Sequence, residues 1–322
     1  MIGTVVDMTK AVVAAAYGGP EVLKVIDRDP GEPGRGQVLI DVMAIGTNPI
    51  DIKTYSGAFG KDPENLPIAL GYEVSGVITA VGADADGITG PLAVGDEVLA
   101  YRVAGGYAQQ LVTSAANVLA KPAGLSFEQG AGLLLTGATA IHMLAATHVV
   151  DGETVLIHGG GGGVGLLAIQ LARLRGATVI ATASHRRHDT LRELGAIPVE
   201  YGAGLADRVR TAAPEGVDVA LDTVGTDEAI ATSLELVADQ SRIATIAGFG
   251  KTDGTGIKLL GGGPGADPGT AIRNAARAEL VRLAGEGELT VTVDRTFPLA
   301  EATAAHRYVL GGHAAGKVIL LP

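Results

Sequence analysis

The chain contains no cysteine. Disulfide bonds are therefore impossible, and a zinc site with thiolate ligands is excluded. The first residues lack the pattern of a signal peptide, and no stretch approaches the roughly 18 consecutive apolar residues that a membrane helix needs. We therefore expect a cytoplasmic protein that has no disulfide and no membrane span.

Positive charge is also scarce. The chain has 24 Lys and Arg against 35 Asp and Glu, which gives a net charge of −11. This balance disfavours nucleic acid and anionic membranes as partners, because both are negatively charged. Apolar residues make up 47 % of the 322 residues, which is enough for the cores of two domains.

Several catalytic motifs are missing. The chain has no G-x-S-x-G elbow, and no Tyr is followed four positions later by Lys. These absences disfavour an α/β-hydrolase and a short-chain dehydrogenase. The G-x-x-x-x-G-K pattern that ends at Lys317 continues with Val318 instead of Ser or Thr, so it does not predict an NTPase loop.

The segments that are present divide the chain in two. Residues 10–125 contain short strand-like runs separated by Gly and Pro, as in a compact barrel. From residue 126 onward, apolar strands such as 154–158 alternate with helices, which predicts a parallel sheet with crossover helices. The tail returns to strands at 289–293 and 318–321. We therefore predict an α/β protein in which a barrel domain, 1–130 and 271–322, carries an inserted doubly wound nucleotide-binding domain, 131–270.

A glycine-rich loop follows the predicted strand 154–158 and opens the apolar helix 164–175. It matches G-x-G-x-x-G, a pattern that is weak alone but informative between a strand and a helix. We expect Gly160 to form the tight turn, Gly162 to let the backbone approach a pyrophosphate, and Gly165 to let helix and sheet pack closely. The predicted phosphate-binding residues are Gly160, Gly162, Gly163, Val164 and Gly165.

The next strand, 178–183, determines which nicotinamide cofactor is expected. NAD-binding domains usually place an acidic residue at its end for the ribose 2′-hydroxyl, and no acid is present here. Ser184 is followed instead by a basic cluster that includes Arg186 and Arg187. Two arginines could bind a 2′-phosphate through charge-assisted hydrogen bonds, so NADPH is favoured over NADH. The alternative, a solvated helix start, fits less well because cations oppose the dipole of a helix N-terminus.

With these motifs in place, the sequence resembles the zinc-independent quinone oxidoreductase branch of the medium-chain dehydrogenase/reductase superfamily over nearly its whole length. The resemblance rests on eight motifs in the expected order: 16–23, 46–51, 95–98, 105–108, 136–140, 158–165, 221–225 and 316–320. It implies a GroES-like barrel with an inserted Rossmann domain. It also implies a homodimer that reduces quinones or α,β-unsaturated carbonyls with NADPH.

The resemblance also implies roles for single residues. Zinc-using relatives place Cys and His ligands where this chain has Asn48 and Tyr72, so no metal is expected even though Glu73 is retained. The implied catalytic positions are Asn48, Asp51, Lys53 and Tyr55, and the proton donor among them stays open. Asn48 also matches a position that faces the nicotinamide ribose, and the other implied cofactor positions are Thr136, Thr139, Tyr201, Thr245, Ala247 and Lys317.

Two other functions are consistent with the same motifs. An enoyl reductase acting on an acyl thioester or a polyketide intermediate would share the fold and the cofactor. A non-catalytic NADPH-binding redox sensor would keep the phosphate loop without a working substrate site. The natural substrate is not readable from the sequence, and the loop 261–269 is either a flap over the cofactor or irregular chain.

Overall fold

The computed structural model describes residues 8–312 and 314–322. It divides into two compact units, which we describe separately. Among the described residues, no helix is long and apolar enough to cross a membrane. Unit 1 comprises Met1–Leu135, Val281–Glu288 and Val293–Pro322, and unit 2 comprises Thr136–Leu280 and Leu289–Thr292.

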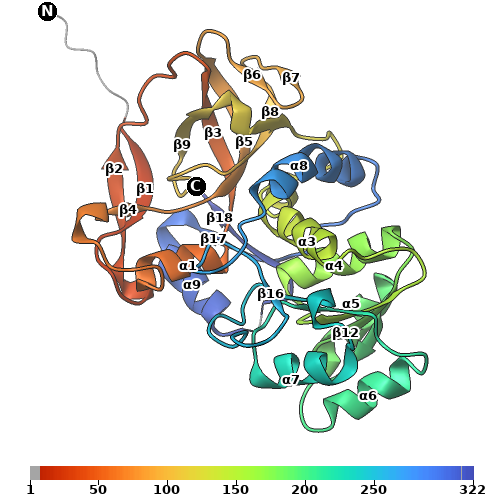
Figure 1. Ribbon diagram of the computed structural model, residues 1–322. Coiled ribbons are helices and arrows are strands. Elements are labelled where there is room, and N and C mark those ends of the chain that lie inside the picture. Colours follow the sequence, from red (N-terminus) through yellow and green to blue (C-terminus); the bar gives the residue numbers. More distant parts are fainter. Residues whose placement is uncertain (1–7, 313) are drawn as a thin grey trace, which may run out of the picture. The chain divides into compact units, whose positions relative to one another are not determined.

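The main sheet of unit 1 has the strand order β10-β8-β5-β3-β18-β17, and β9 also pairs with β3 (Figure 1). Only β17 and β18 run parallel to each other; the other pairs are antiparallel. Strand β18, from the end of the chain, thus lies beside β3, from its beginning. The bounds are β3 Gln37–Gly46, β5 Glu73–Val81, β8 Glu97–Tyr101, β9 Gln110–Ser114, β10 Val118–Ala120, β17 Val293–Pro298 and β18 Lys317–Leu321.

Alternation along β3 shows why this sheet forms. Val38, Ile40 and Val42 are buried, and the residues between them are at least partly exposed. A period of two places the apolar side chains on one face of the strand, where they join the core of unit 1. The remaining elements of unit 1 are β1 Thr9–Ala14, β2 Leu23–Arg28, β4 Ile68–Ala69, β6 Asp86–Gly87, β7 Gly90–Pro91, α1 Pro49–Ser56, α2 Phe127–Gly130 and α9 Ala302–Leu310.

Unit 2 contains a six-stranded sheet of order β13-β12-β11-β14-β15-β16, in which every pair is parallel. The central strand β11, Thr154–His158, and its neighbour β14, Val219–Asp222, are buried at nearly every position. Continuous burial is expected where helices cover both faces of a parallel sheet. The other strands are β12 Thr178–Thr182, β13 Ile197–Val199, β15 Ile243–Thr245 and β16 Lys258–Leu259.

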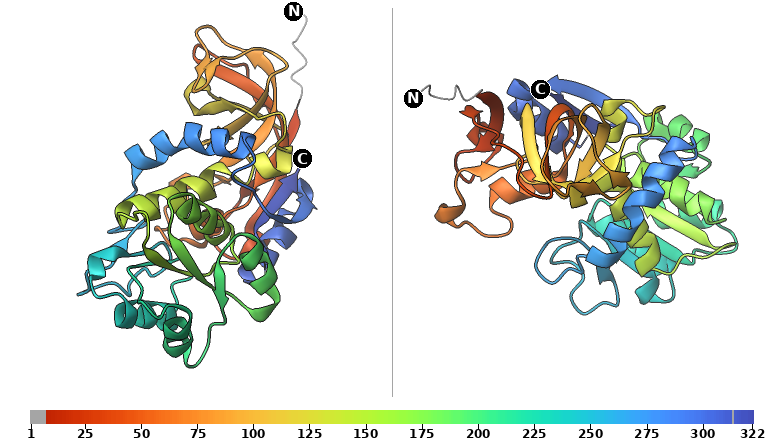
Figure 2. Two further views of the ribbon diagram at one scale, coloured as in Figure 1. Left: turned by 90° about the vertical axis from the view of Figure 1, so that its right-hand side faces the viewer. Right: turned by 90° about the horizontal axis from the view of Figure 1, so that it is seen from above.

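Crossover helices connect these strands and flank the sheet (Figure 2). The order of elements confirms the predicted fold class, an α/β protein with a doubly wound parallel sheet. The helices are α3 Leu134–Ala146, α4 Gly163–Leu174, α5 His188–Glu193, α6 Leu205–Ala212, α7 Asp227–Leu236 and α8 Thr270–Gly285.

Two features of the tail differ from the sequence prediction. No strand covers 289–292, because the side chain of Gln170 takes the place of a neighbouring strand: its amide accepts from Thr290 N at 2.8 Å and donates to Thr290 O at 3.0 Å. Residues 271–280, assigned to the barrel by prediction, lie in unit 2. Arg273 of α8 donates to Thr139 there, and Leu280 packs on Gly137.

Candidate functional site

The phosphate loop joins β11 to α4. Gly159, directly after β11, has a φ of +77°, so it forms the left-handed turn that we had assigned to Gly160. Gly160 is needed for another reason, since a Cβ there would lie 2.8 Å from the Cβ of Ala181 on β12. Gly162 is the N-cap of α4 and no side chain caps it. The first N–H groups of a twelve-residue helix are thus left for an anion.

Gly165 lies one turn into this helix and is buried. A Cβ atom there would lie 2.3 Å from the carbonyl oxygen of Gly159 and 2.8 Å from the Cα of Gly160. The loop can therefore fold back on α4 only over a glycine. This contact is the close packing that the motif predicts.

The basic cluster lies beside this loop. Ser184 follows β12, and the next three residues form a short 3-10 helix, His185–Arg187. The side chain of Arg187 passes close to the loop: its Cγ is 3.3 Å from where a Cβ of Gly161 would be. Arg186 is exposed. The structure thus brings Arg187 and the phosphate loop together, and a contact with a 2′-phosphate stays a prediction.

Other predicted cofactor residues occupy the same edge of the sheet. Tyr201 follows β13 and is 56 % exposed. Thr245 ends β15 and is fully buried; its hydroxyl donates to Asp222 at 2.6 Å and accepts from Ala247 N and Gly248 N. This hydroxyl holds two loops in place. A cofactor contact at Thr245 or Ala247 stays a prediction.

Sequence reasoning missed a cluster on α3 and α8. Arg273 donates from Nη1 to Thr139 Oγ1 at 3.2 Å and from Nε to His142 Nδ1 at 3.3 Å. Because Nδ1 accepts, the other ring nitrogen of His142 carries the proton and donates to Asp267 at 3.3 Å. Thr136 and Thr139 are buried. Arg273, His142 and Asp267 could not be predicted as neighbours of Thr139 from local sequence patterns, because Thr139 and Arg273 are 134 positions apart.

Asp267 also closes the loop 261–269 by backbone hydrogen bonds. Its backbone accepts from Gly261 N at 2.8 Å and donates to Leu259 O at 2.9 Å. Gly263 packs on the ring of Phe249, where a Cβ would meet Cε1 at 2.2 Å. These contacts give the loop a defined path over Phe249.

In unit 1, Asn48 is the N-cap of α1, and the Asp51 carboxylate folds back onto the N–H group of Asn48, whereas the Asn48 side chain caps no backbone N–H. The Asp51 carboxylate accepts from Asn48 N at 2.8 Å and from Gly71 N at 3.0 Å. Burial raises the pKa of Asp51 to about 7, although the two backbone N–H groups oppose the shift. The carboxylate therefore fixes the entry to α1. The Asn-x-x-Asp spacing was a readable signal for this helix start.

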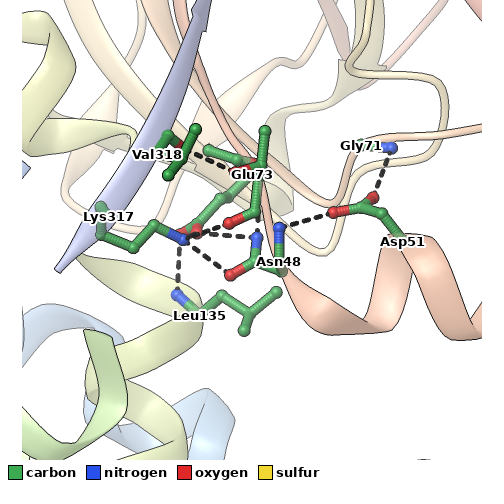
Figure 3. Close-up of polar contacts among 9 residues, drawn as sticks. Asn48, Asp51, Gly71, Glu73, Leu135, Lys317 and Val318 are labelled. Atoms are coloured by element: carbon green, nitrogen blue, oxygen red, sulfur yellow. Dashed lines mark hydrogen bonds and ion pairs between the residues drawn. The ribbon is translucent and has the colours of Figure 1, made fainter. Parts of the chain in front are cut away.

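Asn48 and Lys317 belong to one buried cluster with Glu73 (Figure 3). The Lys317 ammonium lies 2.7 Å from Asn48 Oδ1 and 2.8 Å from Glu73 Oε1. Its third hydrogen bond goes to Thr47 O at 3.0 Å. The structure thus gives Lys317 a role inside the barrel that sequence reasoning did not foresee, and its contact with a cofactor stays a prediction.

Tyr55 and Lys53, the other predicted catalytic residues, do not share this cluster. Tyr55 is fully buried, and its hydroxyl is 3.0 Å from His306 Nδ1; Tyr107 lies 2.7 Å from the other ring nitrogen. Burial raises the pKa of Tyr55, which makes it a poor acid. Lys53 is half-buried, and desolvation lowers the pKa of its ammonium. A substrate contact at Lys53 stays a prediction.

The histidine between these tyrosines gives a pH prediction. Burial lowers the pKa of His306 to about 4, against about 6.5 in an unfolded chain. The unfolded state therefore takes up the proton first, so this contribution is complete above pH 6.5 and is lost as pH falls toward 4. The loss amounts to about 3 kcal/mol. Asp51 forms a hydrogen bond with Tyr107 and has the opposite effect. Because folding raises its pKa, its contribution to stability grows as pH falls.

The two effects are separated by comparing variants. We expect the stability advantage of the wild type over His306→Gln to shrink by about 3 kcal/mol between pH 7.5 and pH 4, because glutamine does not titrate. Urea unfolding at both pH values measures this difference, with His185→Gln as a control for loss of an exposed histidine. A difference that stays constant across this range would contradict the role of His306.

Two family profiles match the chain. The alcohol dehydrogenase GroES-like domain matches residues 34–151, and the zinc-binding dehydrogenase profile matches residues 194–320. The residues present do not fit a zinc ion. Cysteine is absent, and the oxygens of Asn48 and Glu73 are already held by the Lys317 ammonium. Among the described residues, no three His, Cys, Asp or Glu side chains gather as ligands.

Full-length relatives complete the comparison. The chain is 34 % identical to a quinone oxidoreductase of Pseudomonas aeruginosa, with 98 % of this chain and 100 % of the relative covered. A mycobacterial protein complexed with NADPH is 30 % identical, with a TM-score of 0.80 over 98 % and 100 % of the two chains. The CurK enoyl reductase has a TM-score of 0.83 at 27 % identity, over 98 % and 99 %. The chain therefore belongs to the quinone oxidoreductase family of the medium-chain dehydrogenase/reductase superfamily, with its GroES-like and Rossmann domains.

Proposed function

We propose that the chain reduces quinones or α,β-unsaturated carbonyls with NADPH by direct hydride transfer, without zinc. One observation carries the cofactor choice: Arg187 lies against the phosphate loop at Gly161, at the end of a strand that has no acidic residue. A pyrophosphate on the α4 N-terminus would place the adenosine ribose near this edge. A cytoplasmic homodimer is part of the same proposal and rests on the family.

The arginines discriminate through charge. NADPH differs from NADH by a 2′-phosphate, and each charge-assisted hydrogen bond to it is worth about 1.5–3 kcal/mol. Arg186 is exposed and could turn toward a bound phosphate, whereas Arg187 is already beside the loop. NADH offers these side chains only a hydroxyl.

NADPH supplies the hydride, so the chain's residues need only bind, orient and balance charge. Reduction places negative charge on the carbonyl oxygen of the acceptor. Asn48, Lys53 and Tyr55 are the predicted catalytic residues that carry a donor; Tyr55 is committed to His306, and both N–H hydrogens of the Asn48 amide have acceptors. We choose Lys53, because a half-buried ammonium offers positive charge and N–H donors to a developing oxyanion, with a solvent proton completing the reduction.

The test is oxidation of NADPH and NADH, followed at 340 nm, with 1,4-benzoquinone and a simple enone. We expect the wild type to prefer NADPH and the Arg186→Ala/Arg187→Ala variant to lose at least about 100-fold in kcat/KM for NADPH alone. The double variant Arg210→Ala/Arg282→Ala is the matched control, because it removes the same charge from exposed ion pairs. Equal losses in both variants, or equal losses for both cofactors, would contradict the phosphate site.

A second candidate, an enoyl reductase, is favoured by the similarity to CurK enoyl reductase. A crotonyl thioester in the same assay separates the two, because a quinone reductase should turn over benzoquinone much faster. Binding of NADPH without turnover of any of these acceptors would favour the redox sensor.

A further inference from the structure

Lys317 is fully occupied as a donor. An ammonium has three hydrogens, and the three neighbouring oxygens belong to Thr47, Asn48 and Glu73. Lys317 is 4 % exposed and Glu73 is 1 % exposed, so the pair is shielded from water. Glu73 is held from its other side as well, because its second oxygen accepts from Leu135 N at 2.8 Å.

This pair determines how the Asn48 amide is turned. An ammonium only donates, so the Asn48 atom beside Lys317 is the oxygen. A carboxylate only accepts, so the atom beside Glu73 is the nitrogen, at 3.1 Å. The second hydrogen of that nitrogen points to Gly46 O at 3.3 Å. A flipped amide would place donor against donor and acceptor against acceptor.

We propose that Lys317 and Glu73 are positioning residues that hold the Asn48 amide in this single orientation, so that Asn48 accepts a hydrogen bond from a hydroxyl or amide N–H of a bound molecule and donates none. Both amide hydrogens are used within the cluster, and one lone pair of Oδ1 is left. That a molecule is bound here rests on the proposed function. The orientation follows from the cluster itself.

The proposal changes what Asn48 can do in the reaction. A developing oxyanion needs a donor, and this amide has none to give. Loss of Asn48 should therefore weaken ground-state binding and raise KM, with little change in kcat. A residue that stabilised the oxyanion would instead lower kcat.

A double-mutant cycle tests whether Lys317 acts through Asn48. Wild type, Asn48→Ala, Lys317→Met and the double variant are compared by kcat and KM with NADPH and 1,4-benzoquinone. We expect each single change to raise KM about 10-fold, as for one lost hydrogen bond. The double variant should be no worse than Asn48→Ala alone, because Lys317 has nothing left to orient. Lys10→Met, which breaks an exposed ion pair, is the matched control.

If circular dichroism shows that Lys317→Met does not fold, Glu73→Gln takes its place in the same cycle. Benzoquinone has no hydrogen-bond donor, so a higher KM for NADPH assigns the donor to the cofactor. A higher KM only for 2-hydroxymethyl-1,4-naphthoquinone, whose hydroxyl stays protonated at neutral pH, assigns it to the substrate. Multiplicative losses in the double variant, or losses confined to kcat, would overturn the positioning role.

The behaviour of the wild type separates this inference from the proposed function. If the wild type binds NADPH but reduces neither quinone, the same four variants are compared by their dissociation constants for NADPH. A wild type that binds no nicotinamide cofactor would overturn the proposed function together with the inference.

Discussion

Replacing Asp222 by alanine should lower the free energy of unfolding of unit 2 by at least about 3 kcal/mol. The carboxylate is fully buried at the end of β14 and receives three donors: Val224 N, Gly225 N and the Thr245 hydroxyl. Alanine leaves all three without an acceptor in a place that water does not reach, and each costs about 1–3 kcal/mol. Urea unfolding followed by circular dichroism measures the change.

Two further variants sharpen this prediction. Asp222→Asn keeps an oxygen for the backbone donors but turns an N–H group toward Thr245, so we expect an intermediate loss. Asp227→Ala removes a carboxylate that is 93 % exposed and pairs with Lys251, and it should cost less than about 1 kcal/mol. If Asp222→Ala were as stable as Asp227→Ala, the carboxylate would not organise these loops.

Gly165→Ala should weaken NADPH binding by at least about 100-fold, provided that the phosphate loop holds the cofactor as proposed. The added methyl group would meet the backbone of Gly159 and Gly160, and no side-chain rotation can relieve that contact. The loop must move away from α4, which takes its N–H groups out of position. Overpacking of this kind also costs about 1–3 kcal/mol of stability. Fluorescence titration with NADPH and thermal unfolding measure the two effects.

Gly162→Ala separates the two effects. A Cβ at Gly162 would lie 3.5 Å from Gly159 O, an ordinary contact, so stability should hardly change. Affinity should still fall if the pyrophosphate approaches the backbone there. Gly124→Ala, where a Cβ meets nothing within 4 Å, is the control for both measurements. Full NADPH affinity in both loop variants would rule out the loop as the phosphate site.

Most of the fold could be predicted from local sequence patterns. The alternation along β3, the continuous apolar run of β11 and the glycines after it each depend on neighbouring residues, so the sequence alone could reveal them. The basic cluster beside Gly161 was predictable for the same reason, since its position follows from the end of β12. Residues 271–280 were misassigned because the packing of α8 on α3 has no local signature.

The polar contacts inside unit 1 could not be predicted from local patterns, because they join residues that are far apart in the sequence. Lys317 and Glu73 are 244 positions apart, and Tyr55 and His306 are 251 apart. Nothing near Lys317 in the sequence shows that its charge is buried, because lysine is usually a surface residue. The resemblance predicts a cofactor contact at Lys317, but no sequence pattern predicts the contacts of its ammonium with Asn48 and Glu73.

The place of β18 between β3 and β17 has a consequence for biosynthesis. When the ribosome has made β3 and β5, the edge of β3 that receives β18 is open and Glu73 has no cation beside it. At about 5–20 residues per second, β18 follows β5 by roughly 10–50 s. The segments of unit 2, which end at Thr292, are all made before β18. The Rossmann unit can therefore complete its sheet first, and the barrel that is translated first is the one that must wait.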